Sequence, residues 1–271
     1  IARSFGGRAV FAGAVGDDSF GSVLLRRLEQ DGVDLALIRV VKGVPTGTAH
    51  VSYNSDGSRD FVFNIAHSAA AHLPALARIE AGFLAAGITL LHISGSMLGD
   101  PAMRAVGLAL CENLAARGVA ISLDPNIRPE LISDAGYLET LQKIMALACY
   151  VLPSEADADV LFPDQDFATW SARLLAGAAR VVVLKRGDQG CMGRDAGGTV
   201  SLPAQPTSLI DPTGAGDCFC ATFVTLLAAG HAMADALARA NAAGALAVSH
   251  LGPMEGNSSL PEIDRILRGA T

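Results

Sequence analysis

Short apolar runs alternate with longer helical segments along the chain from residue 88 onward. Strands are expected at residues 88–93, 119–123, 150–152 and 181–184, and helices at residues 101–117, 135–148 and 167–178. This alternation predicts parallel βαβ crossovers and an α/β fold whose mostly parallel sheet is covered by helices on both faces. Ligands of such sheets bind at the carboxyl ends of the strands. We therefore look for chemistry in the loops that follow these strands.

The first 65 residues follow a different pattern. Residues 9–14 predict a short buried strand, and the helix after it begins near Asp17 and Asp18, which are most simply interpreted as helix caps. Residues 46–53 and 59–65 are rich in Val, Thr, Tyr and Phe and flank a polar turn. This second pattern predicts a β-hairpin.

Size and composition narrow the class of protein. The chain has 271 residues and is 51% hydrophobic, enough for a large core in one main domain over residues 1–271. The net charge of −7 and six scattered His leave no basic stripe for nucleic acid, so a small-molecule substrate fits better. Five Cys show no metal-ligand spacing and are typical of reduced thiols in a cytoplasmic protein. No apolar run reaches the ~20 residues that cross a bilayer, so we expect no membrane partner.

The most informative stretch is Asp211-Pro212-Thr213-Gly214-Ala215-Gly216-Asp217, followed by an apolar run that predicts a helix. Gly214 and Gly216 allow a sharp turn and a close approach of a ligand to the backbone. The first N–H groups of the helix lack helical partners and favour an anion. Asp217 lies at the same helix start, and a carboxylate beside an anion site is best explained as a group that exchanges a proton. The anion site and this carboxylate together indicate phosphoryl transfer.

Two other loops follow predicted strands and carry polar groups. Asn126 and Arg128 lie in the loop after residues 119–123, where Arg128 is a candidate to hold a phosphate or carboxylate, or else forms a surface ion pair. Gly95 lies between two Ser residues after the first of these strands. That turn is small enough to admit a substrate, although an ordinary strand-to-helix turn has the same sequence.

The string from Asp211 to Asp217 resembles the C-terminal signature of the ribokinase-like, phosphofructokinase-B type carbohydrate kinases. The Asp-x-Asn-x-Arg loop at residues 124–128 resembles the fructokinase and 2-keto-3-deoxygluconate kinase branch. The resemblance implies a three-layer α/β/α sandwich with a mostly parallel central sheet and a small β lid. It also implies an ATP-dependent sugar kinase, which is cytoplasmic.

The resemblance implies roles for individual residues. Asp217 is expected to be the catalytic base and to contact the sugar, with N–H groups that hold phosphate charge from Gly214, Ala215 and Gly216. The residues expected to bind the nucleotide are Lys185, Gly187, Asp188, Gly190, Thr213 and Asn241. The other residues expected to bind the sugar are Gly95, Asn126 and Arg128. Asp157 and Asp211 are the candidate metal residues.

Asp157 departs from the family pattern, in which Asn-x-x-Glu helps to organise magnesium. Ser154 and Asp157 occupy those positions here, and a helix cap at Ser154 is the competing interpretation. Mg²⁺ and, through backbone oxygens of the turn at residues 251–256, K⁺ are implied by the family alone. We expect the hairpin at residues 46–65 to be part of a lid that closes over the sugar and pairs two copies of the chain. The family's remaining lid strands are expected to precede Ile1.

These motifs do not identify which sugar is the substrate. Relatives that act on 2-keto-3-deoxygluconate carry an Arg in the strand where this chain has residues 63–69, which contain none. A sugar acid would therefore lose one charged partner, and a neutral ketohexose such as fructose or tagatose becomes comparably favoured. A nucleoside kinase of the same fold and a non-catalytic sugar or nucleotide binder are the alternatives.

Overall fold

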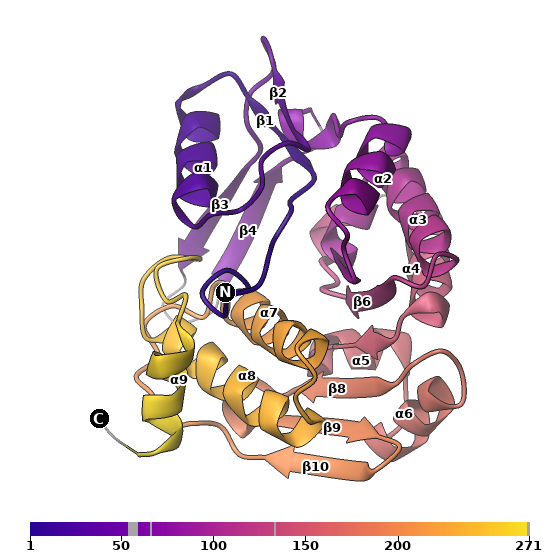
Figure 1. Cartoon of the computed structure of the whole chain (residues 1–271), viewed down its shortest axis with the longest axis vertical. Helices are drawn as coiled ribbons and strands as arrows, with labels where there is room; N and C mark the ends of the chain where they lie inside the picture. Colours follow the sequence, from indigo (N-terminus) through magenta and orange to yellow (C-terminus); the bar gives the residue numbers. More distant parts are fainter. Residues whose placement is uncertain (54–58, 66, 133, 270–271) are drawn as a thin grey trace.

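The computed structural model in Figure 1 describes residues 1–53, 59–65, 67–132 and 134–269. The predicted hairpin turn at residues 54–58 lies outside this range. In the part of the chain that the structure describes, no helix is long and apolar enough to cross a membrane.

A six-stranded sheet forms the centre of the molecule. Its strand order is β10-β9-β8-β7-β6-β5, with β5 to β8 parallel and β9 and β10 antiparallel. The strands are β5 (Leu90–Ser94), β6 (Ala120–Asp124), β7 (Tyr150–Val151), β8 (Val181–Lys185), β9 (Cys191–Asp195) and β10 (Gly198–Leu202). The mostly parallel sheet expected from the alternating pattern is therefore confirmed, and β9 and β10 add a hairpin at one edge.

Helices pack on both faces of this sheet. They are α2 (Leu76–Ala85), α3 (Pro101–Ala115), α4 (Gly136–Leu147), α5 (Glu155–Leu161), α6 (Phe167–Leu175), α7 (Ala215–Ala228) and α8 (Met233–Val248), and α9 (Leu260–Leu267) packs against α8. Short 3₁₀ turns are η1 (Ala69–Ala71), η2 (Gly95–Gly99), η3 (Pro129–Leu131) and η4 (Gly187–Gln189).

Strand β8 shows how the two faces are filled. Val182 joins a core cluster that includes Leu141 of α4, whereas Val181 and Val183 join a second cluster with Phe223 of α7. Successive side chains of a strand point to opposite faces, so an uninterrupted Val run is what a sheet buried on both sides requires. In Figure 1, α7 and α8 lie side by side on one of these faces.

A smaller part of the fold carries the N-terminal elements. Strand β1 (Gly13–Gly16) pairs in parallel with β2 (Ile38–Val41) across helix α1 (Ser19–Gln30). Strand β1 begins at Gly13, later than the expected strand at residues 9–14. In the segment before it, Val10 forms an isolated bridge with Asp34.

Asp18 caps α1 as expected, since its side chain accepts the N–H of Gly21. Strands β3 (Thr48–Tyr53) and β4 (Arg59–Asn64) form the antiparallel pair that the hairpin pattern indicates.

Candidate active site

The N-terminus of α7 has the geometry of an anion-binding turn. Gly214, with φ of 83°, precedes the first helical residue, and a Cβ there would overlap the carbonyl oxygen of Pro253. Only glycine satisfies both conditions, since a left-handed backbone and a missing side chain are needed together. The helix then starts with Ala215 and places Asp217 in its first turn. The N–H of Ala215 makes a long hydrogen bond of 3.4 Å to the carbonyl oxygen of Pro212. The dipole of the helix favours negative charge at this point.

Asp211 holds the loop that leads into this turn. It is almost fully buried, and its Oδ1 accepts hydrogen bonds from N and Oγ1 of Thr213 at 2.9 and 2.7 Å. Its Oδ2 accepts the N–H of Gly252 at 3.1 Å, which ties the turn at residues 251–256 to the glycine loop. Asp211 does not line the cavity described next. The structure thus gives Asp211 a scaffold role in place of the metal role expected from the sequence.

The helix tip opens into a cavity of about 1640 Å³. The cavity is bounded by the loops after β6, β7 and β8, by α7 and α8, and by lid residues such as Phe63. The predicted site residues that line it are Asn126, Arg128, Asp157, Lys185, Gly187, Asp188, Gly190, Thr213, Gly214, Ala215, Gly216, Asp217 and Asn241. The loops at the carboxyl ends of the parallel strands thus meet the glycine turn in one place.

Gly95 is the other expected residue that does not line this cavity. It is buried, and a Cβ there would overlap the carbonyl oxygen of Pro125. The glycine is explained by close packing of two loops rather than by room for a substrate. Its neighbour Ser96 does line the cavity and is hydrogen-bonded to Ser94.

The surroundings of Asp217 suit a group that exchanges a proton. Solvent reaches its side chain, although protein surrounds it on most sides. Burial raises the pKa of the Asp217 carboxyl above its usual value, the negative charge of Asp124 raises it further, and Lys185 and Arg128 oppose the shift. A carboxylate with a raised pKa is a better general base near neutral pH than an ordinary Asp.

Lys185 forms an ion pair behind this tip. Its Nζ lies 2.9 Å from Oδ2 of Asp124 and 3.5 Å from Sγ of Cys220. Burial lowers the pKa of the Lys185 ammonium, yet its negatively charged surroundings outweigh this effect and the net pKa is raised. Burial also raises the pKa of the Cys220 thiol well above its usual value.

Asp157 positions a neighbouring loop. Its Oδ1 accepts the N–H of Ile127 at 2.7 Å, and its Oδ2 accepts N–H and O–H of Ser154 at 2.8 and 2.7 Å. Ser154 and Asp157 form the capping box of α5, in agreement with the competing interpretation from the sequence. Both oxygens accept hydrogen bonds within the protein, which supports the helix-cap interpretation, and the metal role of Asp157 stays a prediction. Across the described ranges, no group of three or more His, Cys, Asp or Glu is placed to hold a metal ion.

Asn126 and Arg128 lie in the loop that Asp157 holds. Asn126 has φ of 38°, unusual for a residue with a side chain, and its Nδ2 donates to Oγ of Ser94 at 3.1 Å. Arg128 is exposed at the cavity and takes part in none of the ion pairs found among the described residues. The guanidinium is thus free to meet an incoming group.

The opposite side of the cavity carries the expected nucleotide residues. Asn241 on α8 donates from Nδ2 to the carbonyl oxygen of Pro203 at 2.7 Å, which fixes the segment after β10 along the cavity wall. Gly190 has φ of 85° and packs against the same segment. Sequence reasoning assigned no role to Asp124. The signal for Asp124 was its position directly after a predicted strand.

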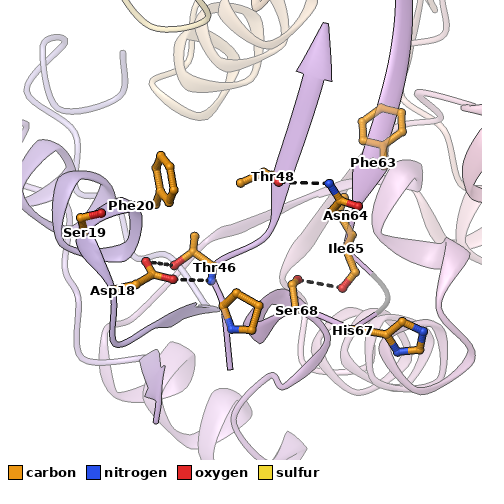
Figure 2. A pocket seen from close by; sticks show the side chains of 11 residues that line it. Asp18, Ser19, Phe20, Thr46, Thr48, Phe63, Asn64, Ile65, His67 and Ser68 are labelled. Atoms are coloured by element: carbon orange, nitrogen blue, oxygen red, sulfur yellow. Dashed lines mark hydrogen bonds between the residues drawn. The ribbon is translucent and has the colours of Figure 1, made fainter. Parts of the chain in front are cut away.

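A second, smaller cavity of about 570 Å³ lies at the base of the lid (Figure 2). Asp18 accepts hydrogen bonds there from N and Oγ1 of Thr46, both at 2.7 Å, which fixes the chain just before β3 to the start of α1. Phe63 and Ile65 line both cavities. The start of the lid hairpin is therefore anchored by a carboxylate, while the hairpin itself separates the two spaces.

Comparison with known proteins gives matches over nearly the whole chain. A family model described as pfkB family carbohydrate kinase matches residues 1–260. A fructokinase of Klebsiella pneumoniae is 33% identical, covering 99% of this chain and 87% of the relative. A 2-dehydro-3-deoxygluconokinase of Bacillus subtilis is 29% identical, covering 89% and 75%. The crystal structure of a putative Ribokinase II from E. coli in complex with ATP and Mg²⁺ has a TM-score of 0.90 and 34% identity, covering 99% and 85%.

Proposed function

We propose that the substrate of this chain, which belongs to the pfkB family of carbohydrate kinases and is an ATP-dependent sugar kinase, is a ketohexose. Its fold is the ribokinase-like α/β fold. The proposal rests on one observation. Asp217, the N-terminus of α7 and the loop that carries Asn126 and Arg128 all line the same cavity. A base and an anion cradle are thereby placed together, as transfer of a phosphoryl group to an alcohol requires.

The reaction follows from that arrangement. The Asp217 carboxylate accepts the proton of a sugar hydroxyl while the hydroxyl oxygen forms a bond to the γ-phosphorus of ATP. The bond from that phosphorus to the bridging oxygen breaks, and ADP leaves with the electron pair. The N–H groups of Gly214, Ala215 and Gly216 hold the charge on the phosphate oxygens. Because the transition state is loose, positioning and charge stabilisation contribute more than base strength.

The choice of a neutral ketohexose rests on the charged groups at the sugar side of the cavity. Among the described residues, Arg128 is the Arg that lines it, and residues 63–65 and 67–69 of the lid side contain none. A carboxylate-bearing sugar is held best by bidentate pairing with more than one cation. The named relatives include both fructokinases and a 2-dehydro-3-deoxygluconokinase. A sugar acid held by Arg128 alone is therefore the second candidate.

ATP is assigned to the wall formed by Gly187, Asp188, Gly190, Thr213 and Asn241. Mg²⁺ fits a site in which the nucleotide's own phosphates are the main ligands, because this ion keeps several of its waters and rarely needs an all-protein cage. When bound, Mg²⁺ neutralises charge on the phosphates. K⁺ at the backbone oxygens of residues 251–256 belongs to the same proposal, and comparing activity in potassium and sodium salts tests it.

The experiment that tests the proposal measures ADP release with fructose, tagatose, 2-keto-3-deoxygluconate, ribose and adenosine. We expect the highest kcat/KM with fructose or tagatose. The highest value with 2-keto-3-deoxygluconate would favour the sugar-acid reading, and activity on ribose or adenosine alone would contradict the ketohexose assignment. If calorimetry detects binding of ATP and sugar while no ADP forms, the chain is a non-catalytic binder.

The lid is also proposed to pair two copies of the chain in the cytoplasm. Phe20 on α1 and Val62 on β4 are more than 60% exposed, and both belong to the part of the fold that carries the lid. Exposed apolar side chains of this size on a lid are well suited to contact a second lid. Light scattering coupled to size-exclusion chromatography should give a dimer, and Val62→Glu should shift it to monomer.

A further inference from the structure

Three side chains from three elements meet behind the tip of α7. Nζ of Lys185, at the end of β8, lies 2.9 Å from Oδ2 of Asp124, at the end of β6. The same ammonium donates to Sγ of Cys220 on α7 at 3.5 Å, and that thiol donates to Oδ2 of Asp124 at 3.5 Å. Asp124 and Cys220 are buried, and the Lys185 side chain is 13% exposed. We call these three residues the Lys185 cluster.

The Lys185 cluster lies next to the backbone of residues 214–216, the turn that is proposed to bind the phosphate. A Cβ placed on Gly216 would lie 3.7 Å from Nζ of Lys185, so the ammonium is next to the backbone residue that precedes Asp217. Cys220 lies three residues after Asp217, one helical turn further along α7. The cluster is therefore fixed to the catalytic turn on both sides of Asp217.

The cluster holds the ammonium by more than one contact. A lysine ammonium has three N–H donors, and here Asp124 and Cys220 take two of them. The flexible stem of Lys185 is thereby fixed, whereas a lysine that binds a nucleotide phosphate must direct its charge to the ligand. This geometry supports a role within the protein, and the nucleotide-binding role expected from the sequence stays a prediction.

We propose that Lys185 is a positioning residue that keeps a fixed positive charge behind the Asp217 turn, and that Asp124 and Cys220 hold it there. This inference rests on the proposed function, in which Asp217 is the base. The positive charge of Lys185 stabilises the ionised form of the Asp217 carboxyl by electrostatic attraction. It also stabilises the negative charge that develops on the phosphate oxygens at the N-terminus of α7 during transfer.

The proposal predicts opposite effects for the two members of the ion pair. The charged groups that face Asp217 are Lys185 at β8, Asp124 at β6 and Arg128 in the following loop. The titratable groups of α7 that interact with it are the thiols of Cys218 and Cys220. Removing the positive charge of Lys185 favours the neutral acid and raises the pKa of Asp217. Removing the negative charge of Asp124 favours the carboxylate and lowers that pKa. A residue with only a packing role does not produce shifts of opposite sign.

The test compares Lys185→Met and Asp124→Asn with the wild-type protein. The pKa of the Asp217 carboxyl is measured by ¹³C NMR on Asp-labelled protein, with the signal assigned by its absence in Asp217→Asn. Lys185→Met should move this pKa upward and Asp124→Asn downward, each by on the order of one pH unit. The acid limb of the kcat/KM profile on the accepted sugar should move in the same directions. Lys143→Met, which removes an exposed charge paired with Glu139, is the control and should leave both unchanged.

Each outcome decides the question. Shifts of the same sign, or none, overturn the proposal, and an increase in the KM for ATP with an unmoved acid limb assigns Lys185 to the nucleotide. If Lys185→Met does not fold, the downward shift in Asp124→Asn still supports the proposal and its absence overturns it. The NMR measurement needs no turnover, so failure of the proposed function, seen as no ADP release from any sugar by the wild type, is distinguishable from failure of this inference.

Discussion

The Asp157 carboxylate holds the backbone of Ile127, since its Oδ1 accepts that N–H at 2.7 Å while its Oδ2 is bound to Ser154. Residue 127 lies between Asn126 and Arg128, the two polar residues of the loop on the sugar side of the cavity. A short carboxylate in place of the family's Glu thus joins the start of α5 to the sugar-side loop. In this chain the acid positions the loop that leads to Arg128.

Asp157→Asn is therefore expected to impair sugar binding and leave the magnesium requirement unchanged. The amide of Asn cannot accept all three hydrogen bonds, and losing a buried one costs about 1–3 kcal/mol. We expect kcat/KM for the sugar to fall roughly tenfold, as about 1.4 kcal/mol corresponds to a factor of ten. Steady-state kinetics at varied sugar and Mg²⁺ concentrations measure both quantities.

The matched control is Asp166→Asn, which changes the carboxylate that caps α6 through the N–H of Thr169 at 2.8 Å. Asp166 does not line the cavity. Its kinetics should match those of the wild type. A higher magnesium requirement in Asp157→Asn with unchanged sugar affinity would restore the metal role.

Gly214→Ala is expected to reduce both stability and turnover. The residue has φ of 83°, and the new methyl group would overlap the carbonyl oxygen of Pro253. Gly230→Ala is the control, since its φ is 88° and nothing lies within 4 Å of the added Cβ. Both variants carry the backbone strain of about 1 kcal/mol. In Gly214→Ala alone, the overlap with Pro253 should lower the free energy of unfolding by about 1–3 kcal/mol more.

Urea unfolding measures the stability difference, and kcat shows whether the turn has lost its shape. Equal destabilisation of the two glycine variants would mean that the contact with Pro253 is not tight. Full activity of Gly214→Ala would mean that the geometry of this turn is not needed for transfer.

Asp18→Asn is expected to weaken the acid dependence of stability. The N–H of Gly21, then the N–H and O–H of Thr46, bind the carboxylate and hold the pKa of Asp18 below its usual value. A depressed pKa gives stability that is present above the unfolded value of about 4 and is lost as the pH falls through the lower folded value. The wild type should therefore lose more stability between pH 5 and pH 2 than Asp18→Asn does.

Urea unfolding at several pH values in that range measures the slope. Asp17→Asn, at the exposed neighbouring residue, is the control and should keep the wild-type slope. A slope in Asp18→Asn equal to that of the wild type would show that the anchor before β3 does not depend on this carboxylate.

Local patterns were sufficient for much of the fold. The Val run of β8 and the spacing of apolar segments predicted the parallel strands, and the start of the chain predicted the Asp18 cap. Strand β2 and helix α2 were not predicted, because short segments of this kind are stabilised mainly by packing. Helix α9 was also not predicted, although its amphipathic pattern and the capping box of Ser259 and Glu262 are signals in the sequence.

The sequence predicted those parts of the candidate site that lie within one continuous motif. The string from Asp211 to Asp217 contains the turn, the helix start and the acid. The ion pair of Asp124 and Lys185 joins positions 61 residues apart on strands separated by β7, so no local pattern contains it. Gly95 illustrates the opposite case. A glycine after a strand has the same appearance whether it admits a ligand or, as here, the backbone of Pro125.

The role of Asp217 is tested by comparing kcat and the dissociation constant for ATP in the wild type and in Asp217→Asn. Loss of a general base lowers turnover by about 10²–10⁴-fold. We expect a fall in kcat of that size with the ATP dissociation constant changed less than about twofold, since the backbone N–H groups of residues 214–216 remain. A variant that keeps a kcat near that of the wild type would contradict the role of Asp217 as the base.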